Sequence, residues 1–99
     1  MMTVSIGTIV AYGGSFEGNT GDRLKRYLQN DGWLVCDGAT VEKDYFFELY
    51  EVIGDNFGKA NSYAMFKLPD LRNSSPGTPL GKCSWIIKAK EESNQKNWF

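Results

Sequence analysis

The chain has 99 residues, a length that accommodates one domain. Eleven Lys and Arg residues against twelve Asp and Glu residues leave a net charge of −1, so the clustered basic excess typical of nucleic-acid binding is missing. The sequence contains no histidine, which excludes Ser and Cys nucleophile mechanisms that use His, histidine zinc sites and histidine pH switches.

The cysteine content and the lengths of the apolar runs indicate the cellular location of the protein. Cys36 and Cys83 do not make a disulfide framework, and we expect both to be reduced and packed as small hydrophobes. No apolar run approaches the roughly 20 residues that span a bilayer. Residues 1–12 carry an apolar stretch without the basic flank or cleavage site of a signal peptide. The sequence therefore predicts a protein without membrane insertion that is made and kept in a cytoplasm.

The first elements are a strand, a loop and a short helix. Alternating β-branched residues predict a strand over residues 4–11, and glycines make residues 13–21 loop-like. A helix is predicted over residues 22–29, with Thr20 or Asp22 as the N-cap and Asn30-Asp31-Gly32 as its end. Its apolar stripe has i, i+3, i+4 spacing and consists of Leu24, Tyr27 and Leu28.

The middle of the chain predicts a strand, a turn and the main helix. The apolar run Trp33 to Cys36 has strand length, Asp37-Gly38 is a turn signal, and residues 39–41 form a second extended piece. Apolar pairs at 3–4 spacing predict a helix over residues 43–53, with Glu42 and Asp44 in its first turn and Gly54 as a left-handed C-cap.

The last part of the chain predicts two short strands. Residues 65–68 form one, halted by Pro69, and residues 84–89 form the other. Residues 55–63 and 73–82 are expected to be loops. We therefore predict a small α+β fold: one domain over residues 1–90, with a helical insertion at 22–30, and a polar tail over 91–99 that ends in Trp98-Phe99.

Taken in order, these segments resemble the phage tail collar domain family over most of the chain. The matching motifs are a strand at residues 7–12, then Gly32-Trp33, Cys36-Asp37-Gly38, Ile53-Gly54, Phe57-Gly58, Leu68-Pro69-Asp70-Leu71-Arg72 and Ile86-Ile87-Lys88-Ala89. Each motif alone is weak, and their order makes the set fairly specific. The resemblance implies assembly rather than catalysis: a structural subunit of a phage tail or of a phage-derived contractile particle. It would be made in a bacterial cytoplasm and located in the virion tail or tail-like particle.

Two departures from the family pattern bear on function. The helix between Gly14 and Gly32 replaces a short Pro/Gly turn, and only residues 73–85 bridge Arg72 to the last strand, where relatives often carry a receptor-binding insertion. The short bridge favours a collar, cap, connector or fibre-adaptor role. Fibre proteins of the family are trimers, so the resemblance implies a homotrimer and other tail proteins as partners.

The motif residues also have physical interpretations of their own. Trp33 is expected in the core, and Asp37 and Asp70 are each expected to accept amide hydrogens of a turn. Arg72 either makes a bidentate pair with Asp37 or Asp70, which would tie the two motifs together, or is solvated.

Other constellations are weak. Residues 77–83 resemble a phosphate-binding loop but are one residue short between the glycines, with Cys83 where Ser or Thr is needed. Asp44 and Glu48 share a predicted helix face without a partner group, which favours a solvated face over acid–base catalysis. We therefore expect no enzyme activity, no cofactor and no metal.

With catalysis and metal binding disfavoured, we expect the protein to act through protein–protein contacts. The candidate interface residues are large aromatics and arginines on the two helices and the tail: Arg23, Arg26, Tyr27, Tyr45, Phe46, Tyr50, Trp98 and Phe99. The alternative is a surface-binding module that recognises a carbohydrate or small ligand with its aromatic side chains.

Overall fold

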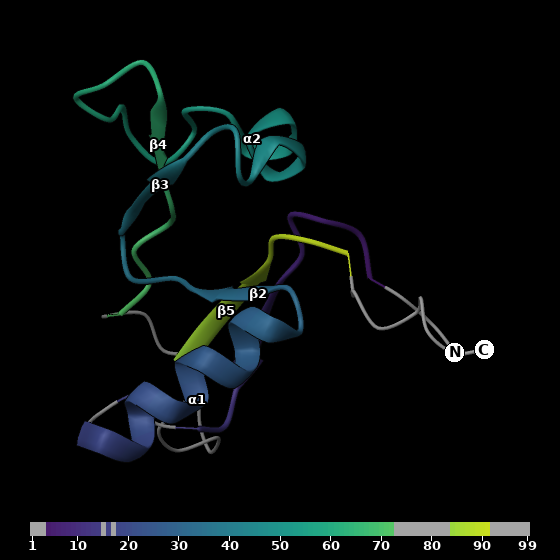
Figure 1. The fold of residues 1–99 in the computed structure, drawn as a ribbon, viewed down its shortest axis with the longest axis vertical. Coiled ribbons are helices and arrows are strands. Elements are labelled where there is room, and N and C mark those ends of the chain that lie inside the picture. The colour runs from purple at the N-terminus through teal and green to yellow at the C-terminus, as the bar shows by residue number, and fades with distance from the viewer. Residues whose placement is uncertain (1–3, 15, 17, 73–83, 92–99) are drawn as a thin grey trace.

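The computed structural model describes residues 4–14, 16, 18–72 and 84–91, which form two small antiparallel sheets and two helices (Figure 1). This arrangement confirms the predicted α+β class. The elements in chain order are β1 (Ile9–Tyr12), α1 (Gly18–Asn30), β2 (Trp33–Val35), β3 (Thr40–Glu42), α2 (Phe47–Ile53), β4 (Met65–Lys67) and β5 (Ser84–Lys88). Neither of these helices has the length and apolar character needed to cross a membrane.

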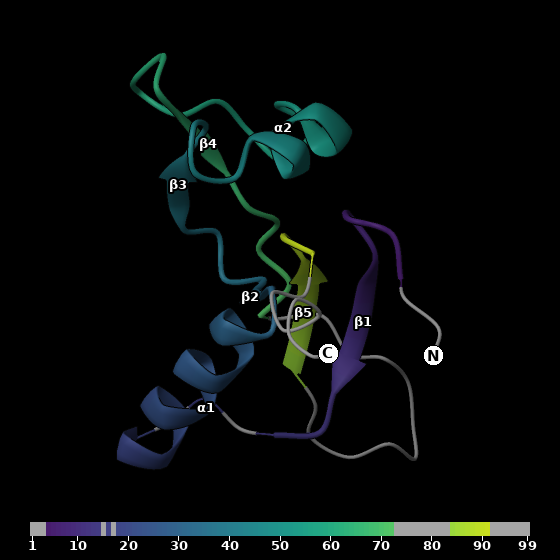
Figure 2. The same cartoon turned by 45° about the vertical axis from the view of Figure 1, so that its right-hand side comes forward.

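The larger sheet is built around the last strand. β5 lies between β1 and β2 and pairs antiparallel with both, so that Ile87 faces Ile9 on one side and Leu34 on the other. The smaller sheet pairs β3 with β4 in the register Val41 to Phe66. α1 lies beside the larger sheet and α2 beside the smaller one, at opposite ends of a molecule of 42 × 37 × 26 Å (Figures 1 and 2).

One hydrophobic core runs across both sheets. Leu49 of α2, Phe66 of β4 and Ile87 of β5 are each 0% exposed. The Tyr50 ring packs on Phe66 at 5.1 Å between centroids, which attaches α2 to the smaller sheet. Burial of these side chains stabilises the fold by roughly 1.5–3 kcal/mol each relative to exposure. The remaining buried members of the core are Leu34, Cys36, Ile53, Leu68 and Ala89.

α1 is longer than the sequence predicts. It begins at Gly18 rather than at residue 22, so Thr20 and Asp22 lie inside the helix and neither is its N-cap. Gly21, which the sequence places in a loop, is buried, and a Cβ there would lie 2.2 Å from the backbone of Phe16. This close approach packs the first turns of α1 onto the incoming chain and overrides the poor helix propensity of glycine. The predicted end is confirmed, since α1 stops at Asn30.

β1 and α2 are shorter than predicted. A turn at residues 6–7 confines the expected strand over residues 4–11 to Ile9–Tyr12. The expected helix over residues 43–53 begins only at Phe47, because the Lys43 amide donates to the Ala64 carbonyl at 2.9 Å and extends the smaller sheet. Consequently Glu42 and Asp44 are not in the first helical turn, where Glu48 is the acidic residue. The other predicted strands are confirmed to within a residue or two.

Candidate functional site

The two most specific sequence motifs lie side by side in the structure. Asp37 and Asp70 form an isolated antiparallel bridge between the end of β2 and the segment after β4. The Gly38 amide donates to the Pro69 carbonyl at 3.0 Å, and the Leu71 amide donates to the Cys36 carbonyl at 3.0 Å. We call residues 36–39 and 68–72 together the motif junction. It connects the larger sheet to the smaller one.

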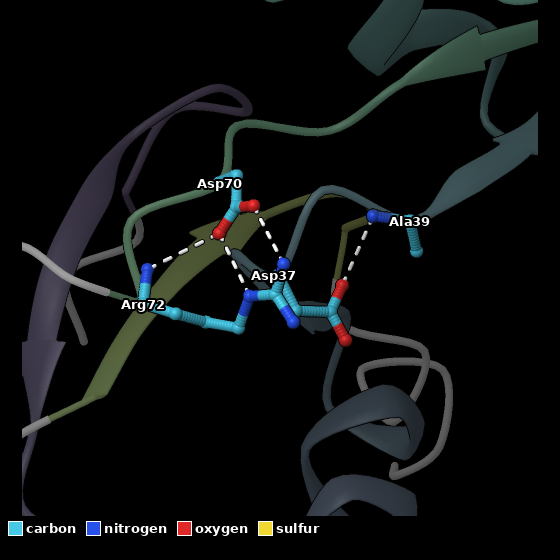
Figure 3. A network of polar contacts seen from close by, with 4 residues as sticks. All are labelled: Asp37, Ala39, Asp70 and Arg72. Carbon is cyan, nitrogen blue, oxygen red and sulfur yellow. Dashed lines mark hydrogen bonds and ion pairs between the residues drawn. The ribbon is translucent and has the colours of Figure 1, made fainter.

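Asp37 and Gly38 form the turn that the sequence predicts. The Ala39 amide donates to Asp37 Oδ1 at 3.1 Å, which confirms the expected role of this carboxylate (Figure 3). Gly38 has φ +77°, in the left-handed region that favours glycine. A Cβ at this position would lie only 3.1 Å from the Asp70 Cβ. Glycine is therefore required for both the backbone conformation and the close approach of the second motif.

Arg72 pairs with Asp70 and not with Asp37. Its Nε donates to Asp70 Oδ1 at 2.8 Å and its Nη2 donates to Oδ2 at 2.7 Å, which is the bidentate geometry (Figure 3). The Arg72 amide also donates to Oδ1, at 3.3 Å. These hydrogen bonds lower the pKa of Asp70 to about 2 and raise the pKa of Arg72. Since both side chains are largely exposed, 66% and 48%, the pair fixes the local loop more than it stabilises the domain.

The link between the two motifs is therefore made by the backbone. The sequence predicts either an Arg72 pair with Asp37 or Asp70, which would tie them together, or a solvated Arg72, and the pair that forms lies within one motif. Asp37 acts on Arg72 only through its charge, which helps to raise the pKa of the guanidinium. The hydrogen bonds of Gly38 and Leu71 bridge the motifs instead.

The apolar members of the motif junction belong to the core. Cys36 and Leu68 are each 2% exposed, Pro69 is fully buried, and Leu71 packs against the core cluster. Burial, and to a lesser extent the neighbouring Asp37 charge, raises the pKa of the Cys36 thiol to about 12. The free, buried state expected for Cys36 is confirmed. Cys83 lies outside the described residues. A thiol that stays protonated at neutral pH is not a nucleophile, so Cys36 is a packing residue.

Trp33 does not lie in the core as predicted, and the burial of its neighbour Lys88 was not predicted. Trp33 is only half-buried, because its position in β2 places the ring beside Lys88 rather than in the core. The Lys88 ammonium lies 5.3 Å from the ring centroid and donates to the Asp31 carbonyl at 3.2 Å, near the end of α1. Lys88 itself is 2% exposed. No sequence signal marks this lysine as buried, since its partners come from β2 and from the turn after α1.

Gly54 ends α2, but not in the predicted left-handed helical conformation. Its dihedral angles are φ +51° and ψ −134°, and its amide donates to the Tyr50 carbonyl at 2.8 Å. The positive φ explains why glycine stands here. The ψ value lies outside the left-handed helical region, so the chain leaves α2 in an extended direction.

The candidate interface residues fall into two separate groups. Arg23, Arg26 and Tyr27 are all exposed on α1. Tyr45 is 61% exposed just before α2, while the Phe46 and Tyr50 rings are half-buried and pack against the core. The structure therefore does not bring all the candidates together. Trp98 and Phe99 lie outside the described residues.

Two surface hollows lie near these groups. The larger, which we call the α2 groove, has a volume of about 390 Å³ and is lined by Tyr45, Phe46, Phe47, Glu48, Glu51, Ala89 and Lys90. The smaller has a volume of about 120 Å³ and lies between α1 and the Asp37 turn. No group of three or more His, Cys, Asp and Glu side chains suited to a metal ion occurs in the described ranges.

The fold and the motif junction define a small structural α+β domain, in which the specific residues hold the backbone rather than present reactive groups. The Phage Tail Collar Domain family matches residues 7–76, so the chain belongs to the phage tail collar domain family, a structural family of phage tails. The match ends shortly after the motif junction and includes both helices. The predicted family is confirmed.

One curated relative places this domain in a larger protein. The chain is 33% identical over 72 residues to Protein RhiB of Rhizobium leguminosarum bv. viciae. The aligned stretch covers 71% of this chain and 33% of that relative, so the chain spans about a third of the length of RhiB. No solved structure gives a significant match.

Proposed function

We propose that the chain is a structural subunit of a phage tail, or of a phage-derived contractile injection particle, and acts by protein–protein assembly as a collar, cap, connector or fibre adaptor. The observation that carries this proposal is the match of residues 7–76 to a structural phage tail family. The motif junction supports it, because its charged side chains pair with each other or with backbone amides.

The partners in this proposal are further copies of the chain, as a homotrimer, and other proteins of the particle. The contact surfaces are the exposed face of α1, the aromatic residues around α2 and the C-terminal tail. Exposed tyrosines support this choice, because aromatic and arginine side chains carry much of the energy of protein interfaces. Tyr27 is 58% exposed and Tyr45 is 61% exposed.

Absolute mass in solution tests the assembly. Size-exclusion chromatography with light scattering, over a hundredfold range of protein concentration, is expected to give a species near three times the 11.1 kDa chain mass. Cosedimentation with purified tail-like particles tests the location separately. A chain that stays monomeric and does not cosediment would contradict the proposal.

A second candidate function is binding of a carbohydrate at the surface. It is favoured by Tyr63, which is 98% exposed and presents its ring as a stacking platform. In that case the isolated domain would bind soluble glycans saturably, as measured by titration calorimetry, and Tyr63→Ala would abolish the heat. Tyr27→Ala is the matched control, because it also removes an exposed tyrosine but from α1.

A further inference from the structure

The exposed face of α1 and the α2 groove carry side chains of opposite charge. α1 lies at one end of the long axis beside the larger sheet, and α2 lies at the other end beside the smaller sheet (Figure 1). The exposed face of α1 presents two arginines and the α2 groove presents two glutamates, in both cases beside exposed aromatic rings. Surfaces at opposite ends of one molecule do not meet within one copy. Their charges are therefore complementary between copies.

The basic surface follows directly from helical spacing. Arg23, Arg26 and Tyr27 are at i, i+3 and i+4, so they lie on one face of α1. All three are exposed, whereas Leu24 and Leu28 turn toward the sheet and are half-buried. The ion pair found within the described ranges is that of Arg72 with Asp70, so neither helical arginine has a carboxylate partner there. We call these three residues the α1 stripe.

The α2 groove already accommodates a cation. The Lys90 ammonium lies 3.9 Å from the centroid of the Tyr45 ring and 5.7 Å from that of Phe46. The two rings pack edge to face at 4.8 Å, which leaves a π face directed at the charge. Glu48 and Glu51 are exposed on the same wall and have no ion pair within the described part of the chain. The groove therefore combines aromatic faces with the carboxylates of Glu48 and Glu51, which outnumber its one ammonium group, that of Lys90.

We propose that the α1 stripe of one copy docks in the α2 groove of a second copy. Guanidinium groups of Arg23 and Arg26 would pair with the carboxylates of Glu48 and Glu51, since Arg suits both bidentate pairing and stacking on aromatic rings. Tyr27 would pack against the exposed Phe47 ring. The contact is head-to-tail, because the two surfaces differ and lie at opposite ends of the molecule. A head-to-tail contact closes into a ring when its rotation permits, as in a trimer, and otherwise propagates as a filament.

This inference rests on the proposed function and deepens it by assigning the surfaces of self-assembly. Charge reversal tests it: Arg23→Glu/Arg26→Glu and, separately, Glu48→Lys/Glu51→Lys are each expected to make the chain monomeric by light scattering. A mixture of the two variants is expected to associate again, since the stripe of one fits the groove of the other. The four substitutions combined in one chain are expected to restore the wild-type mass. Glu42→Lys/Asp55→Lys, which makes the same charge change away from the groove, is the control that should leave the mass unchanged.

Salt gives an independent readout. We expect the dissociation constant of the wild type to rise about tenfold or more between 0.05 M and 0.5 M NaCl, because exposed charge pairs are screened over that range. Circular dichroism of each variant confirms that the domain is folded. An oligomer whose mass does not respond to either charge reversal would overturn this docking while leaving the proposed function intact. A wild type that is monomeric but cosediments with tail-like particles would also overturn only the docking. A monomer that does neither would contradict both.

Discussion

Substitution of Gly38 by alanine measures how far the motif junction holds the domain together. The left-handed conformation at φ +77° costs an alanine roughly 1–2 kcal/mol. The new Cβ would also meet the Asp70 Cβ at 3.1 Å, and Asp70 cannot easily retreat because Arg72 and the bridge to Asp37 hold it. That contact adds about 1–2 kcal/mol of overpacking. The expected loss of unfolding free energy is therefore about 2–4 kcal/mol, which lowers Tm by roughly 10–25 °C for a domain of this size.

The structure offers a matched control for this substitution. Gly18 also has a positive φ, +69°, but a Cβ there would meet nothing within 4 Å. Gly18→Ala therefore carries the conformational cost without the contact and is expected to lose only about 1–2 kcal/mol. Thermal and urea unfolding, followed by circular dichroism, give both values. Equal losses for the two variants would refute the argument that the approach of Asp70 makes glycine necessary at position 38.

Three further outcomes follow from burial and charge. The Cys36 thiol, examined in a Cys83→Ser background, is expected to react with iodoacetamide only on unfolding. The pKa of the Cys36 thiol is raised to about 12, so the contribution of this thiol to stability is complete below pH 9.0 and is lost as pH rises toward 12. Rapid alkylation of the folded protein at pH 8 would show that Cys36 is not buried. The Asp70 carboxyl is expected to titrate near pH 2 by NMR. Its stabilising effect is therefore present above pH 3.8 and is lost as pH falls toward 2. A measured pKa near 3.8 would show that the Asp70 pair with Arg72 does not form in solution. Phe66→Ala should cost about 3–5 kcal/mol of unfolding free energy, whereas Tyr63→Ala should stay within about 0.5 kcal/mol; similar losses would place Phe66 outside the core.

Local signals in the sequence were sufficient where each element is determined by its own residues. The turn at Asp37-Gly38 was predictable because the Asp side chain caps a nearby amide and glycine tolerates positive φ. The existence of β1 and β5, the first and last strands along the chain, was predictable from β-branched runs bounded by turn residues. The end of α1 at Asn30 followed from glycine after the apolar stripe.

Tertiary contacts decided the elements that the sequence did not predict. Helical periodicity over residues 43–53 included four residues that form a turn instead, and the first of them, Lys43, donates its amide to the Ala64 carbonyl beside the smaller sheet. Gly21 looked like a loop residue, and only its close approach to Phe16 explains its place inside α1. The burial of Lys88 likewise depends on Trp33 and Asp31, which reach it from other elements. In each case the deciding partner lies far along the chain, or in a neighbouring segment whose position only the fold establishes.

In the proposed assembly, the motif junction would set the angle between the two docking surfaces. The larger sheet carries α1 and the smaller sheet carries α2, so the angle between the two helices depends on how the two sheets are joined (Figure 2). The backbone hydrogen bonds of Gly38 and Leu71 are part of that joint. A ring of copies closes only if each copy presents its two surfaces at one fixed angle. In the proposed assembly, the most specific motifs of the chain would therefore act as positioning residues, which is why they can be distinctive while carrying neither reactive chemistry nor the interface itself.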